Sequence, residues 1–174
     1  MFRRKKNRVV SIEMNDFFIR ALICDDGDLV KAKMYEYPLP SGIVEDEIVQ
    51  DEMAFFDLLK ELVKEWNISK YDLRFFVPDH SVMMRTFEHP KTIEANGLKA
   101  YVEMELGRTI HLPFENPLID VYDHKSDDGE AVIFAAPSEE VIKLMRLYHD
   151  VKVNPTILDV RTLSTIRFLK STSL

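Results

Sequence analysis

The sequence predicts an α/β fold, and three features of its first half lead to this prediction. Three short apolar-rich strands, expected near residues 9–14, 17–24 and 29–37, are joined by tight polar turns. An amphipathic helix follows these strands, and a fourth apolar strand follows the helix. The resulting order βββαβ, in which strands and helices are mixed along the chain, is typical of α/β domains.

The first helix is expected after a cluster of chain breakers at residues 38–42 and an acidic loop. Asp51 is placed to cap this helix, because its carboxylate can accept hydrogen bonds from the free N–H groups of the first turn. The fourth strand is expected at residues 73–77 and is closed by Pro78. Apolar residues recur at helical spacing and predict one buried stripe, which comprises Phe55, Leu58, Leu59, Leu62, Val63 and Trp66.

Residues 80–129 have a different pattern and predict a small α+β subdomain inserted into the larger domain. Residues 82–88 and 118–123 alternate between apolar and polar side chains, as half-exposed strands do. A helix is expected over residues 92–106. Gly107 suits the end of this helix, because glycine readily adopts the left-handed conformation that ends many helices.

The larger domain is expected to resume after the insert, so that it comprises residues 1–79 and 130–174. The run at residues 131–136 has the continuous apolar character of a central strand that is covered on both faces. Ser138 is placed to cap the next helix. A last strand over residues 153–158 then leads into a closing helix.

Composition is that of a soluble globular protein, with 46% hydrophobic and 30% charged residues in a chain of 174. No apolar run approaches the roughly 18 to 20 residues that span a bilayer. The single cysteine, Cys24, excludes an internal disulfide and fits a reducing cytosol. We therefore expect a cytoplasmic protein.

Charge is distributed unevenly along the chain. Five of the 23 basic residues lie within the first eight positions, which leaves 18 basic and 30 acidic residues, a net charge of −12, in the rest. Such an acidic body repels a polyphosphate backbone, so nucleic-acid binding is not expected. Two interpretations of the basic start remain open: a solvated chain end, or a segment that aids attachment to anionic lipid headgroups.

Several short motifs stand in a fixed order over almost the whole chain. They are Val10–Met14, Gly42–Val44, Glu47–Val49, Phe76–Val82, Arg85, Pro90, Glu103, Glu105, Leu112–Phe114, Asp120–Tyr122 and Leu158–Val160. In this order they resemble the PilM family of type IV pilus assembly proteins, actin-like relatives of the cell-division protein FtsA. The resemblance implies an actin-like, ribonuclease-H-like fold, with the larger domain as subdomain 1A and the insert as subdomain 1C. It covers the N-terminal half of such proteins only.

The first hairpin turn departs from the family pattern. PilM and FtsA proteins open with a glycine-containing phosphate turn behind an aspartate, whereas Ser11, Glu13 and Asn15 stand at those places here. A backbone can wrap a phosphate closely only where glycine lets the main chain approach. We therefore expect a degenerate phosphate turn at Glu13, Asn15 and Asp16. The family's second half supplies the other phosphate loop and the adenosine pocket, so we expect no cofactor and no enzymatic activity.

The resemblance implies a non-catalytic adaptor. Family members hold the short cytoplasmic N-terminal peptide of the bitopic membrane protein PilN in a groove between subdomains 1A and 1C. We expect a PilN-like partner here, in a pilus, secretion or DNA-uptake machine, with peripheral attachment to the cytoplasmic face of the inner membrane through that partner. The residues expected to bind the peptide are Phe76, Pro78, Met83, Arg85, Phe87, Asp120 and Tyr122.

Two interpretations of Arg85 remain open. Its guanidinium either binds a carbonyl or carboxylate of the peptide, or forms an internal salt bridge with Asp120 or Glu103. A separate apolar face is expected to be available for self-association, because contacts with a second half are missing. This face comprises Ile157, Val160 and Phe168.

Two alternative functions also remain. One is residual actin-like ATP binding. The other is a ribonuclease-H-like metal-dependent nuclease, in which Glu13 and Asp79 would hold Mg²⁺ together with Asp120 or Glu52. The five histidines show no metal-ligand spacing, and we expect no metal site outside the nuclease alternative.

Overall fold

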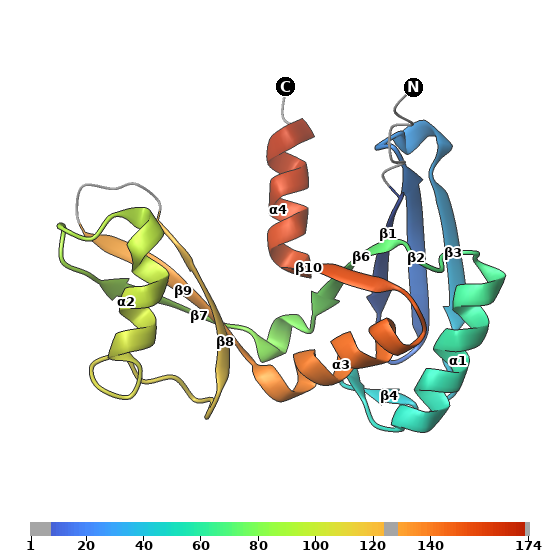
Figure 1. Cartoon of the computed structure of the whole chain (residues 1–174), viewed down its shortest axis with the longest axis horizontal. Helices are drawn as coiled ribbons and strands as arrows, with labels where there is room; N and C mark the ends of the chain where they lie inside the picture. Colours follow the sequence, from blue (N-terminus) through green and yellow to red (C-terminus); the bar gives the residue numbers. More distant parts are fainter. Residues whose placement is uncertain (1–7, 124–128, 173–174) are drawn as a thin grey trace. The chain divides into compact units, whose positions relative to one another are not determined.

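The computed structural model describes residues 8–123 and 129–172, which fold into two compact units (Figure 1). Unit 1 combines Met1–Pro78 with Ile142–Leu174, and unit 2 is Asp79–Val141. Unit 2 thus begins at Asp79 and ends at Val141, whereas the sequence predicts an insert over residues 80–129.

Unit 1 contains a five-stranded sheet in the order β10-β6-β1-β2-β3. The strands are β1 (Arg8–Met14), β2 (Phe18–Asp25), β3 (Lys33–Pro38), β6 (Asp72–Val77) and β10 (Asn154–Val160). The first three form an antiparallel meander, whereas β6 runs parallel to β1 and β10 runs parallel to β6. Because β6 lies parallel to its neighbour β1, the chain must cross over from the edge strand β3, and α1 (Glu52–Glu65) provides this crossover. The predicted βββαβ order and α/β class are confirmed.

The core of unit 1 lies on one face of this sheet. Val10 and Ile12 of β1 are buried against α1 and α3 (Ser138–Asp150), which contribute Phe55 and Tyr148 to the same apolar cluster. The predicted stripe of α1 is confirmed as its inward side. As expected, Asp51 caps α1, since its carboxylate accepts a 3.0 Å hydrogen bond from the Ala54 N–H.

A two-strand hairpin precedes α1 and was not anticipated from the sequence. It consists of β4 (Val44–Glu45) and β5 (Ile48–Val49), joined by Asp46 and Glu47. Both joining residues have positive φ, 51° and 59°. This is the backbone conformation of a type I′ turn, which matches the right-handed twist of the flanking strands.

The closing helix α4 (Arg161–Thr172) leaves apolar surface exposed. Ile157 of β10 is 44% exposed and Phe168 of α4 is 64% exposed, whereas Val160 is half-buried. Unit 1 therefore presents two of the three residues of the expected apolar face to solvent.

Unit 2 is a three-stranded antiparallel sheet with one helix. Its strands lie in the order β7-β9-β8 and are β7 (Met83–Glu88), β9 (Glu130–Pro137) and β8 (Pro117–Tyr122). Helix α2 (Leu98–Glu105) packs on one face, where Leu98 and Val102 join the buried residues of β9.

The strand at residues 131–136 is thus a central strand, but of the small sheet. The sequence places it in the large sheet, and the pairing of β9 with both β7 and β8 corrects that prediction. A strand that is flanked on both sides and covered by a helix is apolar along its whole length in either sheet. The local pattern therefore cannot tell which sheet receives it.

Two elements are shorter than the sequence predicts. The third strand begins at Lys33 instead of residue 29, because Leu29–Lys31 form a 3₁₀ turn that is capped by the Asp28 carboxylate. The helix predicted over residues 92–106 begins only at Leu98, after a second 3₁₀ turn at Ala95–Gly97. Short polar residues favour such local turns over strand or helix.

Replacement of Phe55 by alanine should test the packing of α1. Phe55 is 0% exposed, and loss of a buried phenylalanine ring costs about 3–5 kcal/mol of unfolding free energy. Met53, on the same helix, is 80% exposed, so Met53→Ala should change stability by less than about 0.5 kcal/mol. Urea titration followed by circular dichroism measures both. Equal effects of the two substitutions would contradict the assigned inward face.

Burial of Tyr148 should make stability depend on alkaline pH. Burial raises the pKa of Tyr148 above its ordinary value of 10.0, so the folded state disfavours its ionised form. The free energy of unfolding should therefore be unaffected by this group below about pH 10 and fall at higher pH by up to about 1.4 kcal/mol per unit. Tyr148→Phe should flatten this fall, whereas Tyr122→Phe, at a 60% exposed residue, should not. Denaturant titrations between pH 8 and 11 measure the slope.

Candidate functional site

In the first hairpin turn, the side chain of Asn15 accepts hydrogen bonds from backbone N–H groups of the same turn. The Asn15 Oδ1 atom accepts hydrogen bonds from the N–H groups of Phe17, at 2.9 Å, and Phe18, at 3.0 Å. The Asn15 N–H in turn donates to the Phe18 carbonyl at 3.0 Å. These N–H groups are therefore committed within the chain, and a phosphate would have to displace the asparagine to reach them.

An arginine of the same chain lies beside this turn. The Arg161 Nε atom is 3.1 Å from Glu13 Oε1, and its Nη1 atom is 3.0 Å from Glu47 Oε1. Asp16 completes the arrangement, because its carboxylate accepts a 2.8 Å hydrogen bond from the Glu47 N–H and holds the β4–β5 hairpin against the turn. Three carboxylates and the Arg161 guanidinium thus lie around the first hairpin turn, and the net negative charge disfavours an anionic ligand.

The carboxylates required by the nuclease alternative have separate partners. Glu13 is bound to Arg161, Glu52 lies 3.4 Å from Lys143, and Asp120 accepts a 3.0 Å hydrogen bond from the Val121 N–H. Within the described ranges, 8–123 and 129–172, no three histidine, cysteine or acidic side chains gather as a metal site. The Mg²⁺-binding arrangement of that alternative is not found there.

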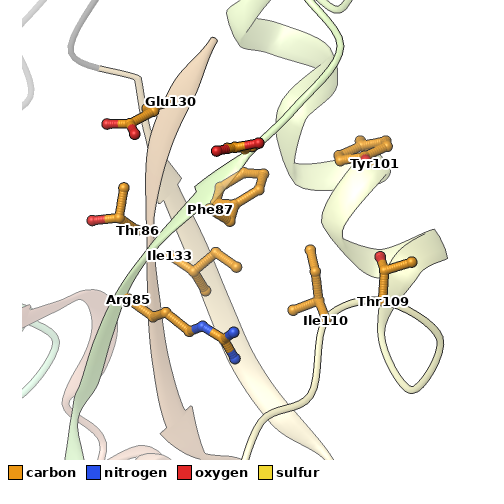
Figure 2. Close-up of a pocket in the computed structure, with 9 residues that line it drawn as sticks. Arg85, Thr86, Phe87, Tyr101, Thr109, Ile110, Glu130 and Ile133 are labelled. Carbon is orange, nitrogen blue, oxygen red and sulfur yellow. The ribbon is translucent and has the colours of Figure 1, made fainter. Parts of the chain in front are cut away.

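Unit 2 contains a pocket of about 490 Å³ between β7 and α2 (Figure 2). Its floor is apolar, and one cation and two carboxylates lie among its lining residues. The lining comprises Arg85, Thr86, Phe87, Glu88, Tyr101, Thr109, Ile110, Glu130 and Ile133.

Strand β7 contributes Arg85 and Phe87 to the pocket, because alternate side chains of a strand lie on the same face of the sheet. Arg85 is paired with Ile133 of β9, and Phe87 is paired with Ala131, so all four side chains lie on the face covered by α2. Figure 2 shows Arg85 and Phe87 pointing toward α2 and the loop that follows it, while Thr86 points to the other side. The Phe87 ring stacks on Tyr101 of α2, with centroids 6.4 Å apart.

The loop after α2 forms the opposite wall. The carbonyl of Glu105 accepts hydrogen bonds from the N–H groups of Arg108, Thr109 and Ile110, at 3.0 to 3.1 Å. This tight turn passes through Gly107 at φ +76°, a conformation that glycine adopts without steric cost. It directs Ile110 into the pocket. Arg85 then reaches across, and its Nη1 atom donates to the His111 carbonyl at 3.2 Å.

The family model of the type IV pilus assembly protein PilM matches residues 19–172 of the chain. This chain belongs to the PilM family. The resemblance inferred from the motifs is thereby confirmed. Among curated protein sequences, none matches the chain.

Two solved structures place the PilM-family chain in the actin-like fold that the sequence predicts. A PilM-PilN type IV pilus biogenesis complex matches with a TM-score of 0.72 and 18% identity, over 94% of this chain and 50% of that chain. The cytoplasmic domain of EpsL, an inner-membrane component of the type II secretion system of Vibrio cholerae, matches with a TM-score of 0.58 and 8% identity, over 87% of this chain and 56% of that one. The chain spans about half the length of these structures.

The residues of unit 2 that are expected to bind a peptide lie on both faces of its sheet. Arg85 and Phe87 share the pocket, and Met83 lies half-buried on the same face of β7. Asp120 is paired with Phe134, the residue next to Ile133, so it lies on the opposite face of the sheet from Arg85. Tyr122 shares that opposite face with Asp120. Phe76 and Pro78 are half-buried residues at the end of β6 in unit 1.

The internal salt bridge considered for Arg85 is not found. Asp120 lies on the other face of the sheet, and among the described residues no carboxylate lies within ion-pair distance of the Arg85 guanidinium. Of the five N–H donors of this group, one bonds to the His111 carbonyl. The guanidinium therefore keeps donors for a ligand.

Sequence reasoning missed most of the pocket lining. Tyr101 packs against the core of unit 2, but nothing in the sequence indicated that a cavity would border it. Ile110 follows a glycine turn, and no periodicity connects it with β7. The lining residues that were not assigned to a site from the sequence are Thr86, Glu88, Tyr101, Thr109, Ile110, Glu130 and Ile133. Separately, no helix of the described residues is both long enough and apolar enough to cross a membrane.

The ion pairs of Arg161 should contribute to stability. Arg161→Ala leaves two half-buried carboxylates without their cation, which should lower the free energy of unfolding by about 1–3 kcal/mol. The matched control is Arg20→Ala, which removes an exposed ion pair with Glu36 and should cost about 0–1 kcal/mol. Urea titrations of both variants measure the difference. A loss no larger in Arg161→Ala than in the control would contradict this role.

Proposed function

We propose that this chain is a non-catalytic adaptor of a type IV pilus or of a related secretion or DNA-uptake machine, and that it binds the short N-terminal cytoplasmic peptide of a PilN-like membrane protein. The observation that carries the proposal is the PilM family match over residues 19–172. The similarity to a structure described as a PilM-PilN complex supports the choice of partner.

The pocket of unit 2 supports peptide binding. Its apolar floor can receive one side chain, and the Arg85 guanidinium at its side can bind a peptide carbonyl or carboxylate in a charge-assisted hydrogen bond. Sites that capture peptides combine a side-chain pocket of this kind with hydrogen bonds to the peptide backbone. Arg85 and Phe87 are therefore the residues that we assign to the partner.

The first hairpin turn supports a role without nucleotide hydrolysis. Its N–H groups are bonded to Asn15, and Glu13, Asp16 and Glu47 lie around it. A triphosphate would meet these carboxylates before any free backbone donor. We propose that the actin-like fold serves here as a scaffold for protein binding.

The location of the chain follows from the proposed partner. The N-terminal peptide of a bitopic PilN-like protein lies on the cytoplasmic side, so its adaptor would be held at that face of the inner membrane. The cluster of Arg3, Arg4, Lys5, Lys6 and Arg8 would add attraction to anionic lipid headgroups.

Calorimetric titration with the N-terminal cytoplasmic peptide of a PilN-like protein from the same organism should test the adaptor role. We expect micromolar binding, and Arg85→Ala should weaken it at least about tenfold, because a hydrogen bond to a charged group contributes about 1.5–3 kcal/mol. Lys60→Ala, at an exposed residue of α1, is the control and should bind as the unchanged chain does. Absence of binding, or equal binding by Arg85→Ala, would count against the proposal.

Thermal unfolding with Mg²⁺ and ATP should separate the adaptor from the residual ATP-binding alternative. A ligand that binds the folded state raises the melting temperature once its concentration exceeds the dissociation constant. We expect no rise at millimolar nucleotide. A rise that Arg161→Ala alters would favour the alternative.

A further inference from the structure

Strand β7 is an edge strand of the unit 2 sheet. In the sheet order β7-β9-β8, strand β7 has β9 on one side and no strand of the described chain on the other. Such an edge presents a row of unpaired backbone groups, which can pair with another extended chain. The pocket of Arg85 and Phe87 lies beside this strand.

The hydrogen bonds of β7 show which of its backbone groups face the open edge. The N–H of His89 donates to the Gly129 carbonyl at 2.9 Å, so this residue faces β9. In antiparallel pairing, successive residues direct their N–H and C=O groups to opposite sides of the strand. Phe87 and Arg85 therefore face β9 as well, and Thr86 and Glu88 face the open edge.

We propose that an extended peptide occupies this pocket by adding to β7 as a fourth, antiparallel strand. The inference rests on the proposed function in taking the pocket as a peptide site, and it adds how the peptide binds and which side chains it carries. Backbone hydrogen bonds to Thr86 and Glu88 supply affinity, and alternate side chains supply specificity. Antiparallel addition continues the pairing of the existing sheet, and antiparallel pairs are slightly more stable than parallel ones.

The side chains of β7 define the sequence that fits. The peptide residue opposite Phe87 enters the apolar pocket, and the residue opposite Arg85 meets its guanidinium. The residue opposite Glu88 lies on the other face, beside the carboxylates of Glu88 and Glu130, which are paired across β7 and β9. From N- to C-terminus, the ligand therefore reads basic, apolar, any residue, acidic.

This direction also suits a peptide that begins near the site. An antiparallel peptide has its N-terminal side at Glu88, whose carboxylate attracts a basic side chain or a nearby α-ammonium group. Its C-terminal end continues past Arg85, toward the start of β7. Charge complementarity at both ends thus selects one direction of the added strand.

Backbone methylation of a designed peptide tests the strand directly. The probe is a fluorescent eight-residue peptide with a free N-terminus and the central order lysine, leucine, threonine, glutamate. N-methylation at the lysine or threonine, which face β7, should weaken binding more than tenfold. Methylation at the leucine or glutamate, which face away, should change it less than threefold. Equal effects at both sets, or no binding of the probe, would overturn the proposal.

The matching change in the protein is Thr86→Pro. The Thr86 N–H faces the open edge, and proline is tolerated on edge strands where no ladder hydrogen bond is lost. The variant should keep its melting temperature and lose probe binding, whereas Thr86→Ala should retain both. Arg85→Glu should reject the probe and accept a version with arginine in place of glutamate. Unchanged binding by Thr86→Pro, or acceptance of both probes by Arg85→Glu, would overturn the proposal.

The same variants separate this proposal from the adaptor role and from a second copy of the chain. If the PilN-like peptide binds with dependence on Arg85 but ignores Thr86→Pro, strand addition is wrong and the adaptor role stands. If the designed probe behaves as expected and the PilN-like peptide does not bind, the adaptor role is wrong and strand addition stands. If sedimentation shows a dimer and Thr86→Pro abolishes it, a second copy of the chain pairs with β7, and the proposal is overturned.

Discussion

The alternation of side chains along strands is the constraint on which both units depend. In unit 1 it sends Val10 and Ile12 of β1 into the core and leaves Glu13 on the other face, where Arg161 binds it. In unit 2 the same alternation sends Arg85 and Phe87 toward α2. A shift of β1 or of β7 by one residue would exchange the faces of that strand and remove the arrangement in its own unit.

The two units use charge in opposite ways. At the first hairpin turn, Arg161 and Asp16 bind neighbouring parts of the chain, so these polar groups hold elements of unit 1 together. In the pocket of unit 2, one N–H group of Arg85 donates to the His111 carbonyl, and its other N–H groups can donate to a ligand. The backbone donors of the first hairpin turn are thus bonded within the chain, whereas a cation with unused donors lies in unit 2, beside an open strand edge.

Helix and strand patterns in the sequence were sufficient to predict much of the fold. The stripe of α1, its Asp51 cap and the βββαβ order follow from local spacing, because each depends on residues close together in the chain. The β4–β5 hairpin and the 3₁₀ turn at Leu29–Lys31 were missed. Both are short, and the hairpin turns on two acidic residues at positive φ, for which glycine or asparagine is the usual signal.

The sequence by itself determined the α/β class, the family and the absence of a glycine phosphate turn. Tertiary structure alone decided that the strand at residues 131–136 belongs to the small sheet, that Asp120 and Arg85 lie on opposite faces, and that Ile110 meets Phe87. The physical reason is the range of the interactions. Caps, turns and stripes arise from neighbours in the chain, whereas strand partners and pockets are chosen by contacts between distant residues, which local patterns do not record.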